Sequence, residues 1–146
     1  MPFPTITPDA LVEEFELFFD WEERYQYLIE LGNAMVPFPV ELQCEENRVQ
    51  GCLSTVWLVC HESKDDPRKL VYSADSDSQL VKGLVAILVQ LYNQKTPEDI
   101  MGLDIVDVFA RIELTQHLSR SRANGLTSRI ARIKTMAINH ASPQTQ

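Results

Sequence analysis

The sequence lacks any apolar run of the roughly 20 residues that a helix needs to cross a bilayer. Residues 1–5 contain neither the positively charged region nor the apolar stretch of a secretory signal peptide. These absences argue against membrane insertion and against secretion. We therefore expect a soluble, cytoplasmic protein with no membrane partner.

Basic side chains are also scarce, because 13 Lys and Arg stand against 21 Asp and Glu, for a net charge of -8. Phosphate binding depends on Lys and Arg, so nucleic acid is not expected as the main partner. Residues 1–46 contain eleven acidic side chains and one basic one, Arg24, whereas residues 120–134 contain five basic side chains and no acidic one. Such a dipolar surface can orient a protein partner, although charge runs on helices usually serve only solubility.

Cysteine is limited to Cys44, Cys52 and Cys60, an odd number, with seven residues between successive cysteines. This is a poor disulfide framework for a cytosolic chain. The C-x₂₋₄-C pair that is typical of structural zinc sites is absent. We expect reduced thiols with separate roles and no bound metal. Within a strand Cys60 would share a face with Val56 and Leu58, so it is predicted to fill the core.

The pattern of apolar residues predicts an α+β fold in which helices pack on a small antiparallel sheet. The 146 residues suffice for a core that needs no disulfide or metal. Since no linker or repeat divides the chain, residues 1–146 are predicted to form a single domain, with a frayed tail at 142–146. Residues 55–61 and 69–72 are rich in β-branched and aromatic side chains and are predicted to pair as a hairpin.

Helix starts are predicted where a capping side chain precedes an apolar periodic stretch. The predicted N-caps are Thr7, Asp20, Ser76, Thr96, Asp104 and Ser121. Asp77 would then lie in the first turn of a helix that runs to Tyr92, where an acidic side chain interacts favourably with the helix dipole. In the last helix the apolar residues follow helical spacing and predict one buried stripe, formed by Leu126, Ile130, Ile133 and Ala137.

The arrangement around Cys52 is typical of a presented, reactive thiol. Gly51 precedes it directly, and a glycine permits a sharp turn that aims the next side chain away from the chain direction. Arg48 lies four residues before it, and a nearby cation favours thiolate over thiol. The alternative interpretation of Cys52 is an inert, buried structural cysteine.

Five segments, in the same order along the chain, resemble the SufE family, the SufE-like and CsdE-like proteins that accept sulfur from cysteine desulfurases. The three long motifs are residues 48–57 (RVQGCLSTVW), 75–84 (DSDSQLVKGL) and 114–126 (LTQHLSRSRANGL). Residues 21–25 (WEERY) and 29–32 (IELG) resemble the second helix of that family. The resemblance therefore spans nearly the whole chain.

The resemblance implies a fold like that of the iron-sulfur scaffold IscU, and a persulfide carrier with Cys52 as the acceptor. Such a carrier takes sulfane sulfur from a desulfurase of the SufS or CsdA kind and stimulates that enzyme. It then delivers sulfur for iron-sulfur cluster assembly on a SufBCD-like complex. Pyridoxal phosphate belongs to the desulfurase, so this chain is expected to hold no cofactor and to be no enzyme itself.

The resemblance also implies roles for residues around the acceptor. Asp77 and Arg122 match family positions linked to placement of the cysteine loop and to the desulfurase interface. Gly51 belongs to the first motif and His117 to the third. His117 has two possible roles, which are to fix a turn by hydrogen bonding or to transfer a proton. Arg48 and Arg122 are the candidate cations that would stabilise the acceptor thiolate.

Two other functions stay open at this point. An iron-sulfur scaffold would use the three cysteines together with a histidine such as His61 as ligands. A cysteine hydrolase would use Cys52, His117 and Asp77 as nucleophile, base and orienting acid.

Overall fold

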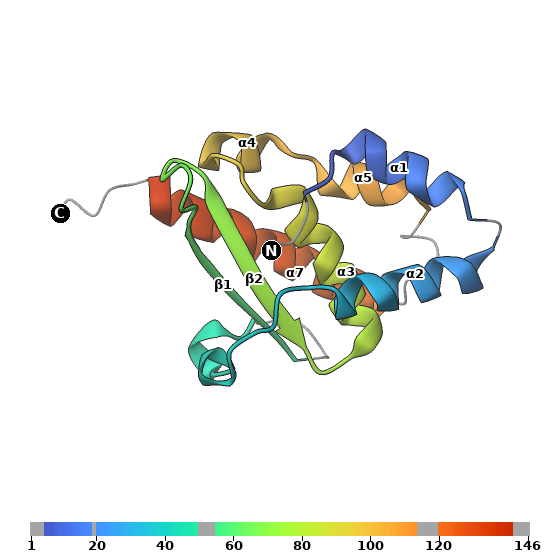
Figure 1. The fold of residues 1–146 in the computed structure, drawn as a ribbon, viewed down its shortest axis with the longest axis horizontal. Coiled ribbons are helices and arrows are strands. Elements are labelled where there is room, and N and C mark those ends of the chain that lie inside the picture. Colours follow the sequence, from blue (N-terminus) through green and yellow to red (C-terminus); the bar gives the residue numbers. More distant parts are fainter. Residues whose placement is uncertain (1–4, 19, 50–54, 114–119, 142–146) are drawn as a thin grey trace.

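The computed structural model describes residues 5–18, 20–49, 55–113 and 120–141, without the side chains of 120–124 and 140–141. Helices make up most of this part, and one hairpin forms its sheet (Figure 1). The elements are α1 (Pro8–Glu16), α2 (Trp21–Asn33), the 3₁₀ turns η1 (Val40–Leu42) and η2 (Glu45–Asn47), β1 (Val56–Glu62), β2 (Leu70–Ser76), α3 (Gln79–Tyr92), α4 (Pro97–Gly102), α5 (Ile105–Arg111) and α7 (Arg120–Ala141). This is the α+β class predicted from the sequence. Within the described ranges, no helix combines the length and the apolar character that spanning a bilayer requires.

Four predicted N-caps are confirmed, because each side-chain oxygen accepts a hydrogen bond from the amide three residues later: Thr7, Asp20, Thr96 and Asp104. Each bond satisfies one of the amides that a first helical turn leaves unpaired. The prediction for Ser76 is wrong, since Ser76 ends β2, and Ser78 caps α3 by accepting from the Val81 amide at 3.4 Å. Ser121 does not cap the last helix either, because α7 already begins at Arg120.

The predicted hairpin is confirmed, with a second strand that continues to Ser76. β1 and β2 are antiparallel, in a register that runs from Val56 opposite Ser76 to Glu62 opposite Leu70. Side chains alternate between the two faces of a strand. The buried face consists of Val56, Leu58, Leu70, Tyr72 and Ala74. This face packs on α3, and α7 lies behind the hairpin in Figure 1.

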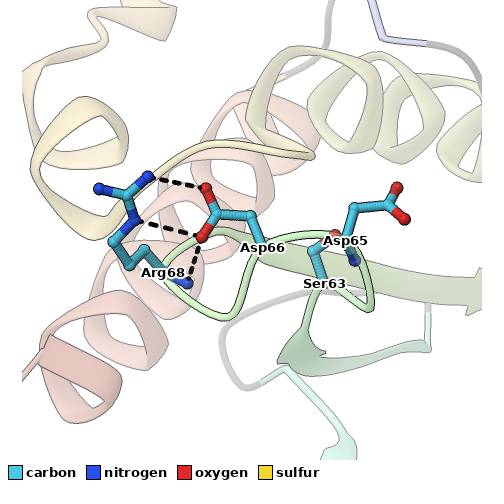
Figure 2. Close-up of polar contacts among 4 residues, drawn as sticks. All are labelled: Ser63, Asp65, Asp66 and Arg68. Atoms are coloured by element: carbon cyan, nitrogen blue, oxygen red, sulfur yellow. Dashed lines mark hydrogen bonds and ion pairs between the residues drawn. The ribbon is translucent and has the colours of Figure 1, made fainter.

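Polar side chains stiffen the turn between the two strands (Figure 2). Asp66 accepts hydrogen bonds from Arg68, at 3.0 Å from the amide N and at 3.1 Å from Nη2. The amide of Asp65 donates to Oγ of Ser63 at 3.3 Å. The side-chain hydrogen bonds from Arg68 hold the pKa of Asp66 below its usual range. This turn lies at the opposite end of the hairpin from residue 55, and so away from the candidate site.

Helix α3 is buried along most of its length, and α2 packs against it with the two backbones in close contact. A β-carbon added at Gly83 would overlap the carbonyl group of Leu28, and one added at Gly32 would lie 2.9 Å from the amide N of Gly83. Glycine permits this approach because it has no side chain. The α2–α3 pair therefore depends on these two glycines.

Arg24 joins three helices instead of forming part of a solvated acidic surface. Its guanidinium donates to the carbonyl oxygens of Phe15 and Ile112, both at 3.2 Å. It also lies 4.8 Å from the centre of the Trp21 ring, and its side chain is 14% exposed. The two carbonyls lie at the C-terminal ends of α1 and α5, where a positive charge is favourable.

The buried stripe predicted for the last helix is confirmed. Leu126, Ile133 and Ala137 are at most 5% exposed, and Ile130 is partly buried against the core. This stripe holds α7 against the core. The polar side chains of α7 that reach toward the hairpin therefore start from a fixed backbone.

Candidate functional site: the stem of residues 50–54

The predicted site residues divide into two groups. Arg48 and Asp77 lie within the described residues, whereas Gly51, Cys52, His117 and the side chain of Arg122 lie outside them. The residues on either side of segment 50–54 fix where that segment begins and ends. We call residues 46–49 and 55–57 the stem.

Backbone pairing joins the two sides of the stem. The amide N of Val49 donates to the carbonyl O of Val56 at 2.8 Å, and Arg48 forms an antiparallel bridge with Trp57. Val49 is 2% exposed and Val56 is 1% exposed, so this pairing is anchored in the core. The residues on the two sides of segment 50–54 therefore lie next to each other, beside the start of β1.

The end of β2 and the residue after it hold the carboxyl-terminal side of the stem. Oδ1 of Asp77 accepts from the amide N of Thr55 at 3.2 Å, and the Asp77 amide donates to the Thr55 carbonyl O at 3.3 Å. Oγ of Ser76 donates to the same carbonyl at 2.8 Å. Ser76 therefore belongs to the sheet and contacts the stem instead of capping α3. Asp77 precedes α3, so the prediction that it lies in the first helical turn is wrong.

Asp75 connects the surroundings of the stem to α3. Its Oδ2 accepts from Nε2 of Gln43 at 2.9 Å, and its Oδ1 lies 3.4 Å from Nζ of Lys82. The side chains of Asp75 and Lys82 are 19% and 31% exposed, so solvent screens this pair less than a surface pair. Asp75 lies opposite Trp57 in the sheet register, so its contacts tie Gln43 and Lys82 of α3 to the strand that pairs with the stem.

Arg132 reaches the amino-terminal side of the stem from α7. Its Nη2 donates to the carbonyl O of Glu46 at 3.0 Å, and its Nη1 donates to the carbonyl O of Arg48 at 3.5 Å. Sequence reasoning missed this residue, because in the sequence Arg132 is one member of a basic run. No periodicity or motif relates residue 132 to residue 46.

Arg48 belongs to the stem and is one of the two candidate cations. Its Nη1 lies 3.7 Å from Oε1 of Glu45, and its side chain is 39% exposed. The neighbouring carboxylate offsets part of the positive potential of Arg48, and solvent weakens both charges. Stabilisation of a Cys52 thiolate by Arg48 and Arg122 stays a prediction.

The two described cysteines have different environments. Cys60 lies on the core face of β1 opposite Tyr72, which confirms it as a core residue, and burial raises the pKa of its thiol to about 11. It is therefore protonated at neutral pH, whereas a nucleophile or a metal ligand must be a thiolate. Cys44 is exposed at the start of η2, with its Sγ 3.4 Å from Nδ2 of Asn47.

Within the described residues, which leave out Cys52 and His117, the geometry supports neither of the two alternative functions. Cys60 and His61 are consecutive in β1 and point to opposite faces of the sheet. In the part of the chain that the structure describes, no three His, Cys, Asp or Glu side chains form a group that could hold a metal. The acid proposed for a hydrolase, Asp77, has its Oδ1 engaged by the backbone amide of Thr55.

Together, the fold and the stem define a small α+β protein in which the residues on both sides of segment 50–54 are held beside the start of β1. The chain belongs to the SufE family, because the family model described as "SufE: Fe-S metabolism associated domain" matches residues 9–137. The resemblance drawn from the motifs is confirmed. Membership supports a sulfur-transfer role in iron-sulfur metabolism and implies a cysteine desulfurase as partner.

Curated relatives agree with this assignment. An uncharacterised SufE-like protein of Rhizobium meliloti (strain 1021) is 44% identical over 131 residues, which cover 88% of this chain and 93% of the relative. An uncharacterised SufE-like protein of Rhizobium etli is 42% identical over 127 residues, which cover 86% of each chain. The solution structure of a hypothetical protein from Thermus thermophilus matches with a TM-score of 0.74 at 18% identity, over 92% of this chain and 95% of that one. That structure supports the fold alone.

Proposed function

We propose that this chain is a persulfide sulfur carrier that accepts sulfane sulfur on Cys52 from a SufS- or CsdA-like cysteine desulfurase. It stimulates that enzyme by removing the persulfide, and it delivers the sulfur to a SufBCD-like scaffold complex in the cytoplasm, without a cofactor of its own. The observation that carries this proposal is the SufE family match over residues 9–137, which includes Cys52 and both sides of the stem.

The transfer step needs no external oxidant or reductant. The Cys52 thiolate attacks the terminal sulfur of the donor persulfide, so a new S–S bond forms at Cys52 while the S–S bond of the donor breaks. The donor cysteine leaves as a thiolate, and the transferred sulfur keeps the proton or charge that it carries. A free thiol has a pKa of about 8.5, so only a few per cent is ionised near pH 7. The positive charges of Arg48 and Arg122 are proposed to stabilise the Cys52 thiolate and so to raise its population.

The stem supports this proposal. Its two sides are held by the sheet, by the turn before α3 and by α7, all of which are parts of the packed fold. A partner that docks beside the stem therefore meets backbone that is already in place, which lowers the entropic cost of positioning the reacting groups. Cys60 is a poor acceptor by comparison, because its thiol is partly buried and protonated.

Sulfur transfer to a single cysteine tests the proposal. The protein is incubated with a cysteine desulfurase and cysteine, alkylated under non-reducing conditions, and analysed by mass spectrometry. We expect one added sulfur atom on Cys52 and none in Cys52→Ser. Cys44→Ser is the matched control, because it removes an exposed cysteine outside the resemblance motifs and should leave transfer unchanged. Undiminished stimulation of the desulfurase by Cys52→Ser would exclude the carrier mechanism.

Delivery is tested separately with persulfidated protein. The protein is first loaded with isotopically labelled sulfur on Cys52. Mixing it with a SufBCD-like complex should then move the labelled sulfur to the complex. If the label stays on Cys52, the sulfur is delivered to a different acceptor. That result would not affect the proposed transfer from the desulfurase to Cys52.

A further inference from the structure

The side chain of Arg132 crosses from α7 to the backbone that precedes segment 50–54. Its two terminal nitrogens donate to the carbonyls of Glu46 and Arg48, at 3.0 and 3.5 Å. Both carbonyls lie at the end of η2, where a short 3₁₀ turn leaves its last carbonyl groups unpaired. A planar guanidinium carries several donors in a fixed fork, so it holds two carbonyls in a way that a lysine ammonium does not.

Helix α7, which carries Arg132, is anchored in the core. The adjacent residue, Ile133, is 1% exposed, and its carbonyl O accepts from the buried hydroxyl of Tyr72 at 2.9 Å. The stem is anchored in turn by the hydrogen bond from Val49 to Val56. A chain of contacts therefore runs from the sheet through α7 to the backbone just before the cysteine-bearing segment.

We propose that Arg132 is a positioning residue for sulfur transfer, which holds residues 46–48 so that the segment with Cys52 begins at a defined place. The inference rests on the proposed function, and Arg132 lies outside the three long motifs that relate the chain to its family. One of its two bonds is exposed and the other is partly buried, so water can replace the guanidinium when it is removed. Its loss should therefore change the geometry of the stem more than the stability of the fold.

The test compares Arg132→Met with Arg132→Lys and with Lys134→Met. Lys134 is a matched control, because it lies two residues further along α7 and donates none of the described hydrogen bonds to the stem. We expect Arg132→Met to lower the transfer rate at saturating desulfurase about tenfold, since misplacing a reacting group by about 1 Å can cost more than that. The half-saturating desulfurase concentration and the Tm should stay close to those of the original protein. Arg132→Lys should recover part of the rate, and Lys134→Met should keep all of it.

Amide hydrogen exchange gives a second readout that needs no partner protein. The Val49 amide should exchange several-fold faster in Arg132→Met, while amides of α3 keep their protection. Unchanged exchange at Val49 together with an unchanged transfer rate would overturn the proposal. Faster exchange in α3 with a lowered Tm would overturn it as well, in favour of a general structural role. If the original protein accepts no sulfur, the proposed function fails, whereas faster exchange confined to Val49 would still establish that Arg132 holds the stem.

Discussion

The Thr55 amide donates to the Asp77 carboxylate at 3.2 Å, and the Asp77 amide donates back to the Thr55 carbonyl at 3.3 Å. This reciprocal pair holds the carboxyl-terminal side of the stem, while Arg132 holds the amino-terminal side. The Asp77 side chain is exposed, so the pair contributes little apolar burial, and its main consequence is a fixed backbone at residue 55.

Replacing Asp77 tests this pair directly. Asp77→Ala removes the acceptor of the Thr55 amide and should cost about 1 kcal/mol of unfolding free energy, the usual net value of one hydrogen bond. Under the proposed function it should also slow sulfur transfer to Cys52. Asp77→Asn is the matched control, because it keeps an acceptor oxygen and should retain most of the stability and rate. Urea unfolding and the mass-spectrometric assay measure the two effects, and equal behaviour of the two variants would contradict the role of the hydrogen bond.

Gly83 should tolerate no side chain. Gly83→Ala places a methyl group on the carbonyl of Leu28, so α2 and α3 must separate. Overpacking of a tight core typically costs about 1–3 kcal/mol, and we expect the upper end because the clash is with backbone. Gly102→Ala is the control, since a β-carbon there meets nothing within 4 Å, and its effect should stay within about 0.5 kcal/mol. Thermal or urea unfolding distinguishes the two variants, and similar losses would refute this account of the α2–α3 contact.

Arg24 should matter more to stability than an exposed arginine. Arg24→Met leaves the partly buried carbonyls of Phe15 and Ile112 without their donor, and we expect a loss of about 2–3 kcal/mol in urea unfolding. Arg111→Met is the matched control, because Arg111 pairs with the exposed Asp9 and such pairs contribute about 0–1 kcal/mol. The interpretation fails if both variants lose the same amount.

Cys60 should react with alkylating agents far more slowly than Cys44. Its pKa of about 11 leaves little thiolate at pH 8, and its side chain is partly buried, whereas Cys44 is exposed. In a Cys52→Ser background, iodoacetamide should modify Cys44 well before Cys60, as followed by peptide mass spectrometry. Reactivity of Cys60 should rise about tenfold per pH unit from pH 8 and level off only near pH 11. Equal rates at pH 8 would show that its thiol is accessible and ionisable.

The raised pKa of Cys60 also links stability to alkaline pH. The protonated thiol is favoured in the folded state, so its contribution is complete below the unfolded pKa of about 8.5 and is lost as the pH rises through about 11. Burial raises the pKa of Tyr72 too, which adds a loss of the same sign at higher pH. Cys60→Val should therefore make the unfolding free energy fall less steeply across this window than in the original protein. Parallel pH profiles would contradict the assignment.

Local signals predicted most of the fold. The caps at Thr7, Asp20 and Asp104 could be predicted because a cap depends on residues within one helical turn. Ser76 was predicted wrongly for the opposite reason: the pattern from Ser76 to Gln79 is a good capping box in the sequence, but pairing with a distant strand keeps Ser76 in β2. Ser78 then caps α3.

By itself, the sequence determined the α+β class, the hairpin, the family and the candidate acceptor Cys52, because these follow from periodicity, from local hydrogen bonding and from contiguous motifs. Only the tertiary structure decided how the stem is held. Asp77 reaches Thr55 across 22 residues and Arg132 reaches Glu46 across 86, and neither separation leaves a periodic trace in the chain. Such contacts arise from the packing of α7 and the sheet on a common core, which no local pattern encodes.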